Sequence, residues 1–317
     1  MTSTKKIQEE AMRKGFGRGL LKAGQESSKV VALCADLTES TQMSLFKNEF
    51  IERFIDVGVA EQNLVSVASG MAAVGKVPFV SSYAAFCPGR CWEQIRTTIC
   101  LNNQNVKIIG SHAGLGVGPD GATHQALEDI ALMRTLPNMQ VFAPADSVEA
   151  EKITLAIAKT NSPSYLRLAR QDSPVFTNKD YPFKIGQGIK IKDGHQITIL
   201  STGIATWHAL QAALELKKQG IDTEVLHFPT IKPLDEKLIL QSAKKTRRFI
   251  TVEDHQVAGG FGSAITELIS EEFPIPIIRI GVEDKFGQSG KPEELLRLYG
   301  ISSTNIIKKA HELIKKN

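Results

Sequence analysis

The chain has 317 residues, which is enough for about two domains of ordinary size. Its residues are 42% hydrophobic and 23% charged, a balance typical of a globular protein that buries a core without disulfides or metals. The formal net charge is only +4 and Lys and Arg are scattered, which argues against a protein that binds nucleic acid or a membrane surface.

The N-terminal stretch MTSTKKIQEEAMRKGFG is charged and lacks the apolar centre of a signal peptide. No apolar run approaches the roughly 18 residues of a membrane helix, so we expect a soluble, cytoplasmic protein. The cysteines form neither a C-x-x-C pair nor a zinc-like spacing with histidine. We therefore expect buried free thiols at Cys34, Cys87, Cys91 and Cys100.

Short apolar runs alternate with helical patterns in the first half of the chain. Strands are expected at residues 30–35, 54–59, 78–83, 106–111, 140–143 and 164–168. Between them, helices are expected at residues 62–74, 90–100 and 147–159. This order predicts a mainly parallel sheet sandwiched by helices, with ligands bound beyond the carboxyl ends of the strands.

The segment at residues 171–183 contains two prolines among polar turn residues and is predicted to be a linker. Residues 185–199 look like a hairpin that turns at Asp193–Gly194. A second α/β series follows, with strands expected at residues 197–201, 223–227, 249–252 and 277–280. We therefore predict two α/β domains, one at residues 1–180 and a smaller one at residues 181–317.

The hexapeptide GVAEQN at residues 58–63 follows an expected strand and begins a helix. A carboxylate at Glu61 would satisfy amides at the helix N-terminus, and this simple cap explains the residue when the motif is taken alone.

A glycine-rich loop, SHAGLGVGPDGATHQ, occupies residues 111–125 and follows a strong strand. Its spacing is not G-x-G-x-x-G, and a Pro-Asp-Gly turn lies where a dinucleotide-binding helix would start. His112, Asp120 and His124 suggest a metal site, but no third ligand lies at tight spacing from the two histidines. Polar residues gathered in one such loop nevertheless favour a functional site.

Other residues are ambiguous when each is taken alone. Tyr83 and Phe86, in SSYAAFCPGRCWEQIR, are aromatics at a strand end and would ordinarily belong to a core. Two glycine clusters, GFGRG at residues 15–19 and GGFG at residues 259–262, are interpreted as close helix packing and a structural turn. Single polar residues near expected strand or helix ends, each typical of a surface charge or a cap, are Arg13, Ser40, Arg167 and Arg170.

Together, in chain order, these segments resemble the transketolase family over nearly the whole chain. The glycine-rich loop and the residues after it, SHAGLGVGPDGATHQALEDIALMRTLPNMQV, are the most specific part of the resemblance. The other segments that carry it are MRKGFG, ADLTES, GVAEQN, SYAAF, PSYLRLARQ, FPTIKPLD and TVEDHQVAGGFG. The resemblance implies a pyrimidine-binding domain of the thiamine diphosphate fold followed by a transketolase C-terminal domain.

One departure from the family concerns the cofactor diphosphate. A complete transketolase also has a domain with a GDG…N motif that holds Mg²⁺ and the diphosphate, and no GDG triplet occurs here. The resemblance is therefore to the C-terminal half of a split transketolase, active only with an N-terminal subunit that binds the diphosphate and Mg²⁺. The family's site lies between protomers, which implies an α₂β₂ heterotetramer.

The resemblance also implies roles for individual residues. In this family thiamine diphosphate stabilises the acyl carbanion equivalent, and Glu61 would face N1′ of its aminopyrimidine. Tyr83 and Phe86 would bracket the pyrimidine, and Asp36 would lie beside the cofactor. His112 and His124 match the family's substrate histidines, with His124 nearer the reacting centre. Asp120 would contact a substrate hydroxyl. The sugar phosphate would be bound by Arg13, Ser40, His112 and Arg170.

The expected reaction is transfer of a two-carbon ketol unit from a ketose phosphate to an aldose phosphate, as in the pentose phosphate pathway. Where the family loop commonly has Glu before the aspartate, this chain has Pro119. A 1-deoxyxylulose-5-phosphate synthase fragment typically lacks a histidine at the position of His112 and has His in place of Asn63. The beta subunit of 2-oxo acid dehydrogenases usually lacks the D-G-x-T-H-Q run, and a non-catalytic scaffold subunit is a further alternative.

Overall fold

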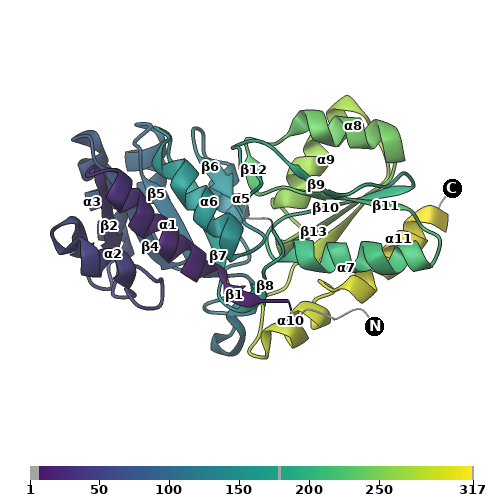
Figure 1. Ribbon diagram of the computed structural model, residues 1–317, viewed down its shortest axis with the longest axis horizontal. Helices are drawn as coiled ribbons and strands as arrows, with labels where there is room; N and C mark the ends of the chain where they lie inside the picture. Colours follow the sequence, from purple (N-terminus) through teal and green to yellow (C-terminus); the bar gives the residue numbers. More distant parts are fainter. Residues whose placement is uncertain (1–6, 178–179, 316–317) are drawn as a thin grey trace.

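The computed structural model describes residues 7–177 and 180–315. Two lobes lie side by side, each a sheet covered by helices, as Figure 1 shows. The sheets hold seven strands in the order β12-β6-β7-β5-β4-β2-β3 and five strands in the order β14-β13-β10-β11-β9 among the described residues. Two α/β domains with mainly parallel sheets were predicted, and this fold class is confirmed.

The elements follow the chain in the order expected. The first lobe contains β1 (Glu9–Ala11), α1 (Met12–Glu26), β2 (Val30–Cys34), α2 (Ser44–Glu49), η1 (Ile51–Arg53), β3 (Phe54–Asp56), α3 (Glu61–Ala73), β4 (Val77–Tyr83), α4 (Trp92–Gln94), η2 (Ile95–Cys100), β5 (Lys107–Ala113), η3 (Leu115–Asp120), α5 (Asp129–Arg134), β6 (Gln140–Phe142), α6 (Ser147–Ala158), β7 (Ser164–Ala169) and β8 (Asp172–Pro174). The later part of the chain contains β9 (Ile189–Lys192), β10 (Ile197–Ser201), α7 (Ala205–Lys218), β11 (Thr223–His227), β12 (Thr230–Lys232), α8 (Glu236–Thr246), β13 (Phe249–Gln256), α9 (Phe261–Glu272), β14 (Ile277–Val282), α10 (Pro292–Leu298) and α11 (Ser303–Lys315). Of these, β12 belongs to the seven-stranded sheet of the first lobe.

Strand β2 shows why continuous apolar runs form the central strands. Its five residues, VVALC, are all buried. Because side chains alternate along a strand, Ala32 and Cys34 join the core cluster that contains α1 and α6 residues, whereas Val31 and Leu33 join the cluster that contains α3 residues. Helices therefore cover both faces of this sheet.

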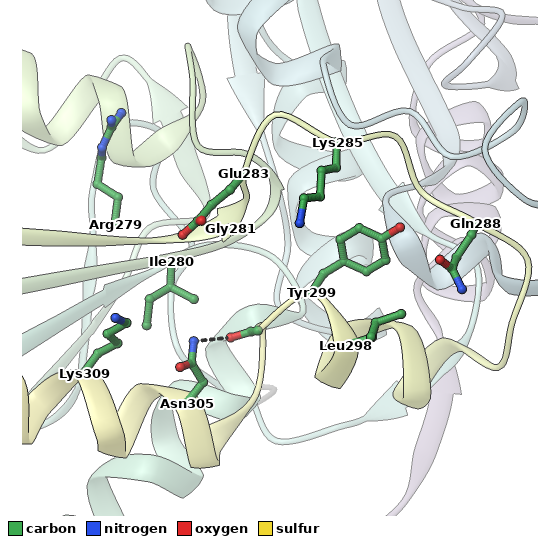
Figure 2. Close-up of a pocket in the computed structure, with 11 residues that line it drawn as sticks. Arg279, Ile280, Gly281, Glu283, Lys285, Gln288, Leu298, Tyr299, Asn305 and Lys309 are labelled. Atoms are coloured by element: carbon green, nitrogen blue, oxygen red, sulfur yellow. Dashed lines mark hydrogen bonds between the residues drawn. The ribbon is translucent and has the colours of Figure 1, made fainter.

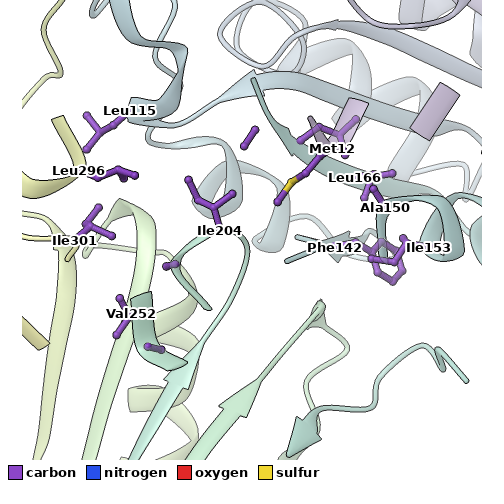
Figure 3. Packing of buried hydrophobic residues seen from close by; sticks show 14 of the residues in the cluster. Met12, Leu115, Phe142, Ala150, Ile153, Leu166, Ile204, Val252, Leu296 and Ile301 are labelled. Atoms are coloured by element: carbon purple, nitrogen blue, oxygen red, sulfur yellow. The ribbon is translucent and has the colours of Figure 1, made fainter. Parts of the chain in front are cut away.

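Both core clusters continue from one lobe into the other. The cluster in Figure 3 joins Met12 and Leu115 of the first lobe to Ile204, Val252 and Leu296 of the second. Strand β12 of the later segment also pairs antiparallel with β6. A buried pair reinforces this junction, because His227 Nε2 lies 2.7 Å from Glu149 Oε2 and both side chains are fully buried. The domain boundary near residue 180 stays a prediction.

The hairpin expected at residues 185–199 is wrong. Strand β9 pairs antiparallel with β11 and not with its neighbour in sequence, β10. Both edges of β10 are occupied by parallel partners, β11 and β13, so β9 has to pair at the outer edge of β11. The cysteine prediction is confirmed, since all four thiols are free and buried.

The glycine cluster at residues 15–19 was interpreted as close helix packing, and the helix it packs against is α6. A Cβ at Gly15 would lie 1.8 Å from the carbonyl oxygen of Ser147, and one at Gly19 would lie 2.8 Å from Thr154 Cβ. Backbone therefore meets backbone at this crossing, and any side chain would separate the helices.

We expect Gly15→Ala to lower the free energy of unfolding of the isolated chain by about 3 kcal/mol or more, because the added methyl has no room. The matched control is Gly70→Ala in α3, where an added Cβ meets no atom within 4 Å. There, alanine is expected to raise stability by roughly 0.5–1 kcal/mol. Urea unfolding followed by circular dichroism measures both, and equal effects at the two sites would contradict the packing argument.

Candidate active site

Glu61 is a buried carboxylate with one open oxygen. It follows the turn at Gly58, whose φ is +71°, and begins α3. The side chain is 2% exposed, and Ser82 Oγ donates a hydrogen bond to Oε1 at 3.2 Å. Oε2 has no hydrogen-bond partner among the described residues, and the nearest cation, Arg90 Nη1, lies 3.7 Å away. The carboxylate therefore bonds across to β4 and is not simply a cap of its own helix.

Four rings gather at the end of β4, close in sequence to Ser82, the donor to Glu61. Tyr83 stacks on His112 with ring centroids 4.0 Å apart. Phe86 meets His124 edge-on at 5.3 Å, and the Tyr83 and Phe86 centroids are 6.2 Å apart. Two residues expected near a pyrimidine ring are thus in contact with the two histidines of the glycine-rich loop.

His112 is the second-last residue of β5 and lies in the left-handed region of the backbone, with φ +55°. Its Nδ1 lies 2.8 Å from the Ser111 hydroxyl, so one of these atoms donates to the other. Burial, and then the charges of Arg13 and Arg170 and of His124, lower the pKa of His112 to about 3. The imidazole is therefore neutral at physiological pH.

Arg13 and Arg170 bring two guanidinium groups to the same place. Arg13 comes from α1 and donates through Nη1 to the backbone oxygen of Arg170 at 2.6 Å. Its Nε is buried and has no partner among the described residues. Burial, followed by the nearby Arg170 charge, lowers the pKa of Arg13. Arg170 donates to the Val117 carbonyl at 2.5 Å, and its Nη1 lies 3.9 Å from Asp120 Oδ1.

Asp36 and Ser40 are less closely joined to this group. Asp36 follows β2 at φ +58°, and its backbone amide donates to Asp56 Oδ1 at 3.0 Å. Because Cys34 of β2 is in register with Ser81 of β4, Asp36 lies at the same sheet edge as Tyr83. Within residues 7–177 and 180–315 we find no hydrogen bond or ring contact from either side chain to the cluster.

Parallel pairing explains the convergence. Strands β2, β4, β5 and β7 run parallel, so their carboxyl ends meet at one edge of the sheet. The cluster consists of Arg13, Glu61, Tyr83, Phe86, His112, Asp120, His124 and Arg170. It combines an open buried carboxylate, apolar ring faces, neutral imidazole and two cations, which suits a ring ligand next to an anionic one.

Family models match two parts of the chain. The transketolase pyrimidine-binding domain matches residues 8–175, and the transketolase C-terminal domain matches residues 186–306. The chain belongs to the transketolase family.

Relatives match it over nearly its whole length. The putative transketolase C-terminal section of Methanocaldococcus jannaschii is 43% identical over 97% of this chain and 97% of its own. The 6-deoxy-6-sulfo-D-fructose transketolase subunit SqwH of Clostridium sp. is 38% identical over 98% and 97% of the two chains. Human transketolase is 40% identical over 96% of this chain, which spans only 49% of the human protein.

A solved structure described as a split gene transketolase, inactive beta4 tetramer, is 44% identical to this chain. It has a TM-score of 0.91 and covers 96% of this chain and 98% of its own. The resemblance read from the motifs, to the C-terminal half of a transketolase, is confirmed by these matches.

The motifs of this transketolase chain left two neighbours of Glu61 unassigned. Ser82 donates a hydrogen bond to Glu61 Oε1, and Arg90 lies beside Glu61 Oε2. The Arg90 guanidinium also lies 5.7 Å from the centre of the Phe86 ring. Both residues are within the SSYAAFCPGR stretch, so the segment was recognised but its polar members were not. Their contacts with Glu61 join β4 and the turn after it to the start of α3, and no spacing in the sequence predicts them.

The GGFG motif is a structural turn, as expected. Glu253 accepts hydrogen bonds from the amides of Phe261 and Gly262 at 2.6 and 2.8 Å, and so caps α9. His255 is fully buried, and its Nε2 accepts from the Ala131 amide at 3.3 Å. Both residues therefore have intramolecular partners in place of a ligand.

A pocket of about 430 Å³ in the C-terminal domain lies apart from the cluster. Figure 2 shows Lys285 and Gln288 on the loop after β14, with the Lys285 side chain pointing toward Tyr299, and Lys309 on α11 at the other side of the pocket. None of the residues assigned to the site lines it.

Across residues 7–177 and 180–315, no group of three or more His, Cys, Asp or Glu side chains is placed to hold a metal ion. None of the described helices has the length and apolar character of a membrane span.

Proposed function

We propose that this chain is the pyrimidine-side subunit of a two-chain transketolase that transfers a ketol unit between sugar phosphates. The observation that carries the proposal is Glu61 Oε2, a buried acceptor without a hydrogen-bond partner among the described residues. Arg90, which lies 3.7 Å from Oε2, also lies over the Phe86 ring. A buried acceptor without a partner is costly unless a ligand supplies the donor. Protonated N1′ of an aminopyrimidine is such a donor.

These residues fit thiamine diphosphate. The cofactor, when bound, supplies the electron sink for breaking and forming the carbon–carbon bond. Glu61 would share a proton with the aminopyrimidine, and Ser82 would hold the carboxylate in place through Oε1. Tyr83 and Phe86 would provide apolar contact to the pyrimidine, with Asp36 near it at the same sheet edge.

The histidines are proposed to move protons on the substrate hydroxyls. His112 is neutral because its pKa is lowered to about 3, so it offers one donor and one acceptor nitrogen. His124 contacts Phe86 and has Thr123 Oγ1 2.9 Å from its Nδ1. We place His124 nearer the reacting carbon and His112 nearer the phosphate end. Asp120, weakly paired with Arg170, would contact a substrate hydroxyl.

The cationic end of the cluster favours a phosphorylated sugar. Arg13 and Arg170 repel one another, and an anion between them would remove that repulsion and pair with the open Arg13 Nε. Ser40 is proposed to complete the phosphate contacts. The donor class is therefore a ketose phosphate, and we assign the reaction to the pentose phosphate pathway in the cytoplasm.

The diphosphate of the cofactor and its Mg²⁺ are proposed to bind to a second polypeptide. The two matched domains are the pyrimidine-binding and C-terminal ones, and the chain spans 49% of human transketolase. A similar split-gene chain is described as an inactive beta4 tetramer. These findings support an active α₂β₂ assembly with an N-terminal, diphosphate-binding subunit.

A second substrate class is supported by one relative. The 38% identical SqwH subunit is named for 6-deoxy-6-sulfo-D-fructose, whose sulfonate is also anionic. Arg13 and Arg170 would bind a sulfonate by the same contacts. Donor sugars that carry a phosphate and donor sugars that carry a sulfonate are therefore both tested.

The decisive experiment is a ketol-transfer assay with thiamine diphosphate and Mg²⁺, with this chain alone and then with the diphosphate-domain chain from the same source. We expect transfer from xylulose 5-phosphate to ribose 5-phosphate only when both chains are present. Activity of this chain alone would contradict the two-chain proposal. A formed complex that uses neither the phosphate nor the sulfonate donor would favour the scaffold alternative.

A further inference from the structure

The side chain of Asp254 reaches from the C-terminal domain into the glycine-rich loop. Asp254 lies on β13, is 3% exposed, and accepts through Oδ1 a hydrogen bond from the Leu115 amide at 3.1 Å. Its Oδ2 is buried and has no hydrogen-bond partner among the described residues. Neither His112 nor His124 touches Asp254 directly, but Leu115 is only three residues after His112.

The loop is shaped around this carboxylate. Gly114 has φ +81°, and a Cβ there would lie 2.0 Å from Asp254 Oδ2. The Gly114 amide donates to the Ala126 carbonyl at 2.9 Å, which closes the base of the loop. Only glycine fits between the carboxylate and this hydrogen bond, so the backbone path after His112 is determined by where Asp254 lies.

Arg167 ties the backbone of Asp254 to the other end of the loop. Its Nη2 donates to the backbone oxygen of Asp254 at 2.7 Å and to that of Ala126 at 3.4 Å. Its Nε bonds to Asp129 Oδ2 at 2.9 Å, and all of these groups are buried. Both ends of the glycine-rich loop therefore meet at one residue of β13.

Further contacts from the C-terminal domain support the same loop. Gln125 Nε2 donates to the carbonyl of Gln288 at 3.0 Å, on the segment drawn in Figure 2. Leu115 belongs to the core cluster of Figure 3 and lies near Leu296 of α10, and η3 packs against that helix. The loop that carries both histidines is thus held from outside its own domain.

A purely structural interpretation does not explain the open oxygen of Asp254. A buried carboxylate with one oxygen unpaired destabilises a fold, and burial raises the pKa of this group. The contacts of Asp254 fix the backbone that follows His112. His112 lies in the left-handed region of the backbone, and its ring stacks on Tyr83. The unpaired oxygen lowers the stability of the fold, whereas the same contacts give His112 a defined position.

We propose that Asp254 is a positioning residue through which the C-terminal domain holds the glycine-rich loop and directs His112 and His124 toward the substrate. The inference rests on the proposed function for the roles of the histidines. Its structural part, that Asp254 determines the order of the loop, holds independently of the reaction.

The test compares Asp254→Ala with Asp254→Asn and Asp254→Glu. Alanine removes the acceptor for Leu115. Asparagine keeps an oxygen in the same place, whereas glutamate keeps the charge but displaces it by one methylene. The control, Glu267→Gln, removes a charged partner of Arg134 in another interdomain ion pair that does not touch the loop.

Hydrogen exchange of peptides covering residues 111–127 is measured on the chain, and kcat, KM and cofactor affinity on the reconstituted complex. For alanine and glutamate we expect exchange of the Leu115 amide to accelerate at least about 10-fold and kcat/KM to fall about 10- to 100-fold, with cofactor affinity unchanged. Asparagine is expected to restore both to within about 3-fold of wild type, because its oxygen still accepts the Leu115 hydrogen bond.

Unchanged exchange in the alanine and glutamate variants would overturn the proposal, as would an equal kinetic loss in Glu267→Gln. If alanine does not fold, the comparison of glutamate with asparagine decides the same question. If the wild-type pair transfers no ketol unit, the proposed function fails, while the exchange measurement still tests the role of Asp254.

Discussion

Replacing Glu61 with glutamine is expected to lower kcat of the reconstituted complex about 1,000-fold, with a much smaller change in the KM for either sugar. An amide has nearly the same shape as the carboxylate, but it cannot take up or share a proton with the aminopyrimidine. Oε2 is buried and has no hydrogen-bond partner among the described residues, so it is open to make this contact. Steady-state ketol transfer at saturating thiamine diphosphate measures the loss.

Two controls separate proton sharing from general damage near the sheet edge. Glu39→Gln changes an exposed carboxylate after β2 and is expected to leave kcat unchanged. Ser82→Ala removes the donor to Oε1 and is expected to cost about 10-fold, because it loosens the carboxylate but retains its charge. Retention of more than a tenth of wild-type kcat by Glu61→Gln would refute the assigned role.

Replacing Arg170 with methionine is expected to raise the KM for xylulose 5-phosphate about 100-fold, since it removes a charge-assisted contact to phosphate. The effect on kcat should be small, because the phosphate is remote from the bond that breaks. Unphosphorylated xylulose is the matched control substrate, and its KM should stay within about 2-fold of wild type. An equal rise for both sugars would show that the arginine supports the loop, through Val117, and not the phosphate.

The same variant has an expected consequence for the pH profile. The Arg170 charge is one of the groups that lower the pKa of His112, so its removal raises that pKa from about 3. If His112 must be neutral, kcat/KM falls as the pH drops through this pKa. The acid limb of the profile should therefore move to higher pH in Arg170→Met.

The sequence predicts the buried strands well, for a local reason. Strands such as β2 and β10 are buried on both faces, so they consist of short continuous apolar runs between helical patterns. The predicted hairpin failed because pairing is not local. A turn at Asp193–Gly194 is compatible with β9 beside β10, yet β10 already has two parallel neighbours.

As with the fold, the sequence predicted one part of the candidate site and missed another. Polar residues that follow parallel strands are expected at one edge, and this principle places Glu61, Tyr83 and His112 together. Ser82, Arg90 and Asp254 were not assigned, because each acts through a contact between distant segments. The VEDH motif was recognised as part of the family pattern, but nothing in its spacing shows that its aspartate reaches the loop of the other domain.

Sequence alone therefore determined the two-domain α/β class, the family, the free thiols and the residue types of the site. Tertiary structure alone decided that Glu61 has one satisfied and one open oxygen, that His112 is held neutral, and that Asp254 meets Leu115. The division has a physical cause. Burial patterns and turn residues act over a few positions of the chain, whereas desolvation, charge proximity and hydrogen-bond satisfaction depend on which distant segments the fold brings into contact.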